Sequence, residues 1–230
     1  MYPIAITITA LAFFLLLILI LIKTGYTEKL LFKLGLMPPK PRNNWTAVAW
    51  NNCLKKYDCS ADIAFFGDSL TYGSDFHKYF KDKKIVNLGC GGDTIQDLIN
   101  RTYLIKTVEP KKIFLLCGIN GLTDLNIKKS AEKYEELIIK IKEIAPEAEL
   151  YIQSVLPISK SKERSICHNL SIIKFNTQIE DLAKKYSATY IDLHPSFFVN
   201  NELNPEFTKD GLHLLPPAYT AWKNIIEKYI

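Results

Sequence analysis

Histidine is scarce in this sequence of 230 residues, and the four that are present do not form a metal site. Neither His77 nor the pair Asp192 and His194 belongs to a cluster with the ligand number and spacing that a metal ion requires. Arginine-rich stripes and aromatic nucleic-acid motifs are also missing, and the lysines behind the net charge of +5 are scattered. We therefore expect neither a metal cofactor nor a nucleic-acid partner.

A glycine-rich segment, GCGGDT at residues 89–94, follows an apolar run in the way that a phosphate-binding loop does. It lacks the lysine and hydroxyl pair of a P-loop and the six-residue glycine spacing of a dinucleotide site. We therefore expect no nucleotide at this loop, and no organic cofactor.

The overall composition is that of a folded globular protein. Apolar residues make up 48% of the chain and charged residues 23%, which is close to the globular average and excludes disordered and fibrous classes. A chain of 230 residues is long enough for one domain and an appendage.

Charge is absent between Tyr2 and Ile22, and residues 10–22 (ALAFFLLLILILI) are entirely apolar. At a helical rise of about 1.5 Å per residue, the stretch from Ile4 to Ile22 reaches roughly 28 Å, nearly the thickness of a bilayer's hydrocarbon core. We predict an uncleaved transmembrane anchor over residues 1–22. A cleaved signal peptide is the alternative, although it typically has a positive start, a shorter apolar stretch and a small-residue cleavage box.

Residues 23–60 are predicted to be a basic tether between this anchor and a domain at residues 61–230. The segment EKLLFKLGLM is amphipathic enough to lie along a membrane surface, and PPKPR is a stiff spacer. Cationic residues that follow the span favour a cytoplasmic domain by the positive-inside rule: Lys23, Lys29, Lys33, Lys40 and Arg42. Despite this distribution of lysines, we expect an extracytoplasmic domain.

The five cysteines leave the redox compartment open. Cys53 and Cys59 are close enough in sequence for a small disulfide loop, which would indicate an oxidising compartment. Five reduced cysteines fit the sequence at least as well. Cys90 and Cys117 lie in apolar segments, and we expect them to be packed, unreactive thiols.

Short apolar runs alternate with longer segments of helical periodicity from residue 62 onward. The predicted strands are residues 62–67, 84–89, 111–118, 148–155 and 188–193, and the predicted helices are residues 94–108, 128–144, 166–186 and 216–229. This alternation predicts an α/β fold with a five-stranded parallel sheet and helices on both faces. Ligands bind beyond the carboxyl ends of such strands, so the side chains that follow each strand are candidates for a site.

Small and polar residues follow the first three predicted strands, and an Asp-His pair follows the last. The candidates are Gly67, Asp68, Ser69, Gly91, Gly92, Gly118, Asn120, Asp210 and His213. On one helical turn, Asp210 would orient the imidazole of His213. A serine is a weak nucleophile unless a histidine removes its proton and a carboxylate holds that histidine in the right tautomer. Amides of a glycine loop and of an asparagine are suitable donors to the resulting oxyanion.

The blocks FFGDSLTYG, VNLGCGGDT, LLCGINGL and DGLHL, in this order, resemble the SGNH hydrolases, also called GDSL esterases and lipases, over about residues 62–230. The resemblance implies a flavodoxin-like, three-layer α/β/α sandwich. It implies that Ser69 is the nucleophile and that Asp210 and His213 complete a catalytic triad. It also implies an oxyanion hole made by the amides of Ser69 and Gly92 and the side chain of Asn120.

Gly121 departs from this family pattern. Family members usually carry an aspartate after the asparagine, whereas here Gly121 follows Asn120. Glycine loosens a turn, so we expect Asn120 to be held less firmly and activity to be lower.

Several candidates also have structural interpretations. Asp93 and Thr94 are expected to cap the helix that follows them, and Asp68 is expected to brace the serine turn by a hydrogen bond. His213 would serve only as a cap of the helix near Pro216 if it had no catalytic role. The serine block and Asp210 favour the catalytic role.

These observations predict a membrane-anchored serine esterase that hydrolyses carboxylic esters through an acyl-enzyme intermediate. The segments YIQSVLP and LNPEFTKDGLH, with the size of the chain, resemble family members that remove acetyl groups from carbohydrates. The resemblance implies a glycan or small-molecule ester with a short acyl group as substrate. The alternatives are a lysophospholipase or thioesterase acting on lipid acyl esters, and a catalytically inactive protein that binds acylated ligands.

Overall fold

The computed structural model describes residues 60–163 and 165–230, and five strands of this region form one parallel sheet. The strands are β1 (Ile63–Gly67), β2 (Ile85–Gly89), β3 (Lys112–Leu116), β4 (Glu149–Gln153) and β5 (Thr189–Ile191), in the order β2-β1-β3-β4-β5. This is the flavodoxin-like order, in which ligands bind where the strand order reverses, beside β1. The predicted parallel sheet is confirmed.

The three neighbouring strands β2, β1 and β3 end at the same level. Gly67 at the end of β1 pairs with Gly89 of β2 and with Leu116 of β3. All five residues of β1 are buried, because helices cover both faces of the sheet. The loops that follow β1, β2 and β3 therefore leave the same edge side by side.

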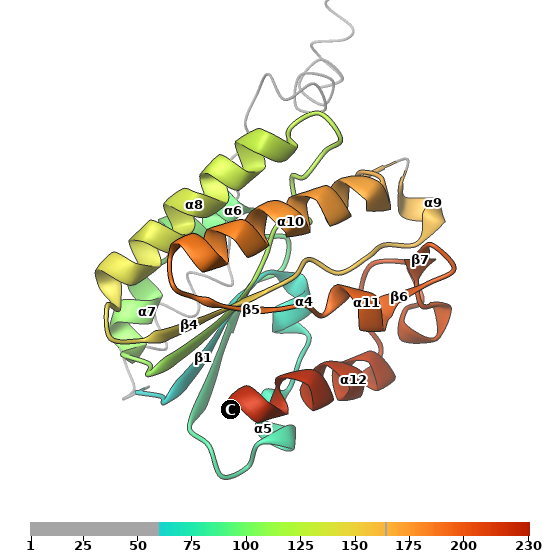
Figure 1. The fold of residues 1–230 in the computed structure, drawn as a ribbon. Helices are drawn as coiled ribbons and strands as arrows, with labels where there is room; N and C mark the ends of the chain where they lie inside the picture. Colours follow the sequence, from blue (N-terminus) through green and yellow to red (C-terminus); the bar gives the residue numbers. More distant parts are fainter. Residues whose placement is uncertain (1–59, 164) are drawn as a thin grey trace, which may run out of the picture. The chain divides into compact units, whose positions relative to one another are not determined.

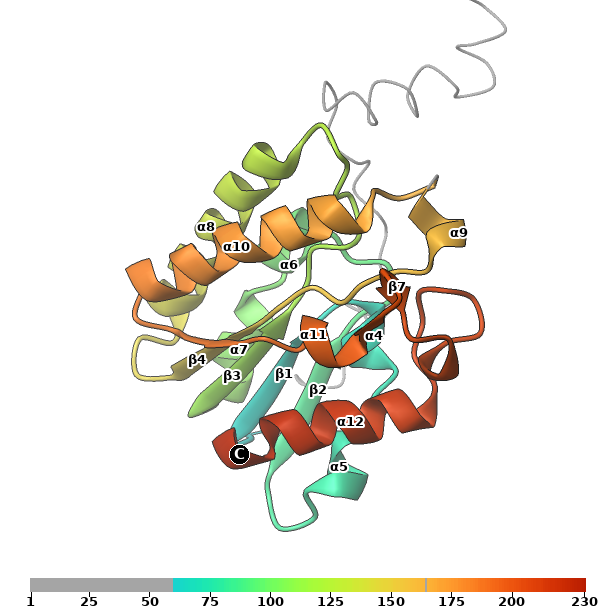
Figure 2. The same ribbon diagram turned by 45° about the vertical axis from the view of Figure 1, so that its right-hand side comes forward.

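Helices form a layer on each face of the sheet, which Figure 1 and Figure 2 show from two directions. One layer contains α6 (Ile95–Asn100), α7 (Tyr103–Val108), α8 (Ile127–Ile144) and α10 (Asn169–Lys185), and the other contains α5 (Phe76–Tyr79), α11 (His194–Phe197) and α12 (Pro216–Ile226). Shorter elements are α4 (Ser69–Tyr72), α9 (Lys160–Glu163), the hairpin of β6 (Phe198–Val199) and β7 (Glu202–Leu203), and 3-10 turns at Pro205–Phe207 and Glu227–Tyr229. The expected three-layer α/β/α sandwich is confirmed.

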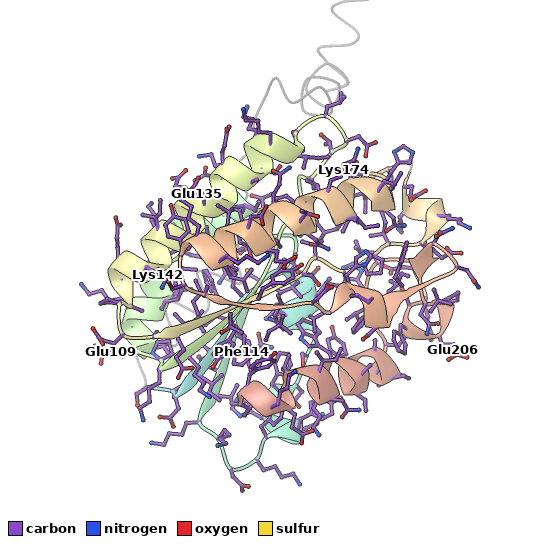
Figure 3. All side chains as sticks on the ribbon, viewed as in Figure 1. Glu109, Phe114, Glu135, Lys142, Lys174 and Glu206 are labelled. Carbon is purple, nitrogen blue, oxygen red and sulfur yellow. The ribbon has the colours of Figure 1, made fainter. Side chains whose placement is uncertain are left out.

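Neighbouring side chains of β1 enter two different hydrophobic cores, because alternate residues of a strand point to opposite faces. Phe66 packs in the core under α8 and α10, whereas Phe65 packs in the core under α12. The Phe65 ring stacks on Phe76 and Phe114, with centroid distances of 3.6 and 4.9 Å. Figure 3 labels Phe114, whose ring lies on the α12 side of the sheet together with the buried Trp222.

Two predicted helices have different boundaries in the structure. The helix predicted at residues 94–108 is divided into α6 and α7 at Arg101, whose side chain turns inward to bind carbonyl groups of the sheet. The helix predicted at residues 166–186 begins only at Asn169. Both differences depend on tertiary contacts that periodicity does not report.

Among the described residues, no helix combines the length and the apolar character needed to cross a bilayer. The anchor predicted at residues 1–22 and nearly all of the tether predicted at residues 23–60 lie outside the described residues. Cys53 and Cys59 also lie outside them.

Candidate functional site

Ser69 begins the short helix α4, two residues beyond the end of β1. Asp68 is the N-cap of this helix, and its Oδ1 accepts a hydrogen bond of 2.9 Å from the Leu70 amide. Gly67 allows the tight turn, because a Cβ there would lie 2.2 Å from Thr71 Oγ1. The expected brace by Asp68 is confirmed, and the turn presents Ser69 at the carboxyl edge of the sheet.

The loop after β2 carries Gly92 beside this turn. The amide of Cys90 donates to the carbonyl of Gly67 at 3.0 Å, which joins the two loops at their start. Gly92 has a φ of 76°, in the left-handed region that favours glycine. Thr94 caps α6 in a capping box with Asp97, as predicted for Thr94.

The N-cap residue of α6 is Thr94, whereas Asp93 forms a buried ion pair with Arg101. Asp93 Oδ2 lies 2.5 Å from Arg101 Nε, and both side chains are almost completely buried. Arg101 also donates to the carbonyls of Leu88 at 2.6 Å and of Gly67 at 2.7 Å, and its guanidinium lies over the Phe66 ring. Arg101 thus ties the ends of β1 and β2 together directly below the Ser69 turn.

Sequence reasoning missed this role of Arg101. The available signal was an arginine within the helical pattern of residues 94–108, eight residues after Asp93. A charged side chain that is buried needs a partner, and Asp93, in the loop after β2, is an acidic residue close in sequence.

Asn120 lies on the loop after β3 and contacts the loop that carries Gly92. Its Nδ2 donates to the carbonyl of Asp93 at 3.0 Å. Gly121 adopts a φ of 91°, and its carbonyl accepts a hydrogen bond of 2.9 Å from Asn126 Nδ2. The turn expected to be loosened by Gly121 is therefore closed by the Asn126 side chain, in a backbone conformation that favours glycine.

Asp210 and His213 contact each other directly. His213 Nδ1 lies 2.7 Å from Asp210 Oδ2, and Asp210 Oδ1 accepts from the His213 amide at 2.8 Å. The pair lies in an irregular loop rather than on the helical turn considered above, and Thr208 closes this loop by donating to the His213 carbonyl at 2.8 Å. Leu215, not His213, is the N-cap residue of α12. The arrangement fixes the imidazole with Nε2 available on its other side.

Electrostatics favour the ionised form of Asp210. Partial burial alone would raise its pKa, but hydrogen bonds from the His213 ring and from the amides of His213 and Leu212 outweigh burial and hold the pKa well below its usual range. A carboxylate that stays ionised accepts from Nδ1–H and keeps that proton in place.

The pKa of Asp68 shifts in the opposite direction from that of Asp210. Burial raises the pKa of Asp68 to about 7. The hydrogen bond from the Leu70 amide and the charges of His213 and Arg101 lower this pKa, and the charge of Asp93 raises it, but burial is the largest effect. The charge of His213 acts on Asp68, so the loop that carries Asp210 and His213 lies within electrostatic range of the residue that precedes Ser69.

A hydrogen bond connects α12, the helix that follows the loop of Asp210 and His213, to α4, the helix that begins at Ser69. Tyr219 on α12 donates its hydroxyl to the Leu70 carbonyl on α4 at 3.0 Å. A Cβ at Gly73, directly after α4, would lie 2.3 Å from that hydroxyl. Since α12 begins three residues after His213, this contact links segments that are about 150 residues apart in the sequence.

The remaining sequence candidates are two histidines and two cysteines. His77 is exposed on α5, and His194 is the buried first residue of α11, where burial lowers its pKa. Residues 60–163 and 165–230 contain no group of three metal-ligating side chains. Cys90 and Cys117 are buried, as predicted, and burial raises the pKa of the Cys117 thiol well above its ordinary value.

Comparison with known proteins finds relatives by family and by fold. The model of the GDSL-like lipase/acylhydrolase family matches residues 65–221. A solved protein of Streptococcus pneumonia named for platelet activating factor has a TM-score of 0.71 and 23% identity, over 80% of this chain and 90% of that one. A GDSL-like lipase from Bacteroides thetaiotaomicron has a TM-score of 0.67 and 21% identity, over 80% of this chain and 97% of that one.

An acetyl xylan esterase of known structure has a TM-score of 0.63 and 19% identity, over 73% of this chain and 98% of that one. At these identities the structural likeness shows the fold. No curated protein matches the sequence.

Proposed function

Because the chain belongs to the GDSL-like lipase/acylhydrolase family, we propose that it hydrolyses carboxylic esters with Ser69 as nucleophile, His213 as base and Asp210 as the orienting carboxylate. The observation that carries this proposal is the Asp210–His213 pair, with 2.7 Å between Oδ2 and Nδ1, on the loop that leads into α12. The hydrogen bond from Tyr219 on α12 to the Leu70 carbonyl on α4 supports the proposal, because it links the helix that follows this pair to the helix that begins at Ser69.

Each proposed group has a defined part in a two-step reaction. Ser69 Oγ attacks the ester carbonyl while His213 Nε2 takes the hydroxyl proton and passes it to the departing alkoxide. Water then attacks the acyl-enzyme with His213 as base, which releases the acid and restores Ser69. The amides of Ser69 and Gly92 and the Asn120 side chain are the proposed donors to the oxyanion. The hydrogen bond from Asn120 to the Asp93 carbonyl supports this by holding the second and third loops together.

We infer that the acyl group is short, as in an acetyl ester of a carbohydrate. The resemblance of two sequence segments to carbohydrate acetylesterases supports this, as does the fold shared with an acetyl xylan esterase. A lysophospholipase or thioesterase is the second candidate, favoured by the apolar stretch at residues 1–22. Measuring kcat/KM on aryl esters from acetate to palmitate distinguishes them, because a short-acyl site loses activity as the chain lengthens.

The serine role is tested by Ser69→Ala. We expect the turnover of an aryl acetate to fall by about 10³-fold or more, with the fold unchanged by circular dichroism. A fluorophosphonate should label the native protein at Ser69 and leave the variant unlabelled. Absence of labelling in the native protein would instead favour an inactive protein that binds acylated ligands.

We also propose that residues 1–22 anchor the protein in a membrane, that residues 23–60 are a tether, and that the catalytic domain is extracytoplasmic. The uncharged apolar stretch supports the anchor. Protease added to intact cells tests the side of the membrane. Digestion only after lysis would place the domain in the cytoplasm, as the lysines after the stretch favour.

A further inference from the structure

Two irregular loops carry the proposed oxyanion donor and the proposed base, and both are connected to the first turn of α10. Residues 117–126 include Asn120, and residues 208–215 include Asp210 and His213. Side-chain hydrogen bonds within each loop, from Asn126 in the first and from Thr208 in the second, fix the shape of that loop. Neither loop is part of the sheet, so a further connection is needed to fix the distance between them.

Asp124 connects the first loop to α10. Its Oδ1 accepts from the His168 amide at 2.8 Å and from Ser171 Oγ at 2.7 Å, and its Oδ2 lies 2.7 Å from His168 Nδ1. One carboxylate therefore joins the loop of Asn120 to the N-cap and the first turn of the helix. The hydrogen bonds from His168 and Ser171 outweigh the partial burial of Asp124 and lower its pKa, so the carboxylate is ionised at neutral pH.

Asn169 connects the same helical turn to the second loop. Its side chain forms two hydrogen bonds with the backbone of Ile158: Oδ1 accepts from the amide at 2.9 Å, and Nδ2 donates to the carbonyl at 2.8 Å. The next residue, Ser159, donates its amide to the carbonyl of Gly211 at 2.9 Å. Gly211 lies between Asp210 and His213, so the bonds of Asn169 lead directly to the loop of the proposed base.

We propose that the first turn of α10, through His168 and Asn169, holds the loop of Asn120 and the loop of His213 at the separation that ester hydrolysis requires. The proposal rests on the proposed function and makes Asp124 and Asn169 positioning residues. They act through Asn120 and His213. A shift of about 1 Å between catalytic groups lowers turnover by roughly 100-fold, so loss of either connection should reduce kcat more than it raises KM.

The chain provides a matched control for each residue. Asn176, two turns along α10, binds the backbone of Val155 in the same reciprocal way, at 2.8 and 2.9 Å, and is equally buried. Glu135 on α8 accepts from Lys185 Nζ at 2.6 Å and from Tyr186 Oη at 2.7 Å, at the other end of α10. Like Asp124, it is a carboxylate that connects another segment to α10 by hydrogen bonds. Figure 3 labels Glu135 on α8. The hydrogen bonds of the two controls end on Val155, Lys185 and Tyr186, none of which lies in the loop of Asn120 or the loop of His213.

The kinetic test compares Asn169→Ala with Asn176→Ala, and Asp124→Ala with Glu135→Ala, in the full chain with an aryl acetate. We expect kcat to fall about tenfold to a hundredfold in Asn169→Ala and Asp124→Ala, with KM within about threefold of the native value. The two controls should keep kcat within about threefold. Asp124→Asn retains an oxygen that accepts from the His168 amide and should recover part of the loss. Equal losses within both pairs would overturn the proposal.

Amide hydrogen exchange tests the same connection without requiring turnover. In Asn169→Ala, the amides of Ser159 and Gly211 should lose protection relative to the native chain, whereas Asn176→Ala should leave both unchanged. Unchanged exchange at Ser159 and Gly211 in Asn169→Ala would overturn the proposed positioning. If the native chain neither hydrolyses esters nor reacts with a fluorophosphonate, the proposed function fails, and exchange still decides whether Asn169 holds the loop.

Discussion

Asp68 places a carboxyl group where burial favours its neutral form. Its pKa of about 7 lies above the value near 3.9 expected in the unfolded chain. Between about pH 4 and pH 7 the unfolded state releases this proton while the folded state keeps it, so the free energy of unfolding decreases as pH rises through that window. The Asp68 contribution is then constant above about pH 7.

Asp68→Asn removes this titration and keeps an oxygen for the Leu70 amide. We expect the free energy of unfolding of the variant to vary less between about pH 4.5 and pH 7 than that of the native chain, by up to a few kcal/mol. Urea unfolding at the two pH values measures the difference. An identical pH dependence in both proteins would mean that Asp68 is ionised in the folded state.

Arg101 neutralises Asp93 in the interior and supports the strand ends below Ser69. Removing one partner of a buried ion pair leaves an unpaired buried charge, which costs about 3–5 kcal/mol, whereas removing both charges costs much less. We therefore expect Arg101→Met to be strongly destabilised in urea and Asp93→Asn to restore part of its stability in the double variant. A double variant no more stable than Arg101→Met would show that the carbonyl contacts of Arg101 matter more than the ion pair.

At the level of elements, the position of α4 depends on α12. The Tyr219 hydroxyl binds the Leu70 carbonyl, and a Cβ at Gly73 would lie 2.3 Å from the same hydroxyl. Gly73 has a φ of −70°, which alanine adopts easily, so the hydroxyl is the main obstacle to alanine there.

Gly73→Ala should therefore destabilise the protein by about 1–3 kcal/mol through overpacking, and Tyr219→Phe by about 1–2 kcal/mol through the lost hydrogen bond. In the double variant the missing hydroxyl makes room for the methyl group. The combined loss should be smaller than the sum of the two single losses when measured by urea unfolding. If the loss in the double variant equals the sum of the two single losses, the two residues do not interact.

The sequence predicts the strands and the long helices well and the four-residue helices poorly. The five strands are apolar runs, and the stripe of α8 repeats at three and four residues, so both follow from burial alone. The four-residue helices α4, α5 and α11 are too short to show a period. The interruption of the helix at Arg101 depends on carbonyl groups of the sheet, which are distant in sequence.

The residues of the candidate site also differ in how well the sequence predicts them. Motifs with a chemical meaning, such as the Asp210–His213 spacing, predict which residues meet, and the structure brings these two together. The residues that hold the motifs in place carry no such signal. Asp124 and Asn169 are ordinary polar residues in the sequence, and only the folded chain shows that each binds the backbone of another segment.

At the level of the whole molecule, the described residues contain two hydrophobic cores and every residue of the proposed site. One core extends from Ala61 to Ala183 and the other from Ile63 to Ile226, with the sheet between them. A chain that begins at Ser60 thus retains both cores and the three loops at the sheet edge. The domain bounds predicted at residues 61–230 stay a prediction.

We therefore expect residues 60–230 to fold cooperatively and to hydrolyse an aryl acetate with a kcat within about threefold of the full chain, because the groups proposed to react and to position one another all lie within them. Urea unfolding and steady-state kinetics of both chains, with the full chain in detergent, measure this. A loss of kcat beyond about tenfold, or a broad unfolding transition, would show that residues before Ser60 contribute to the catalytic domain. Equal kcat with a large loss only on membrane-bound esters would assign those residues to substrate access.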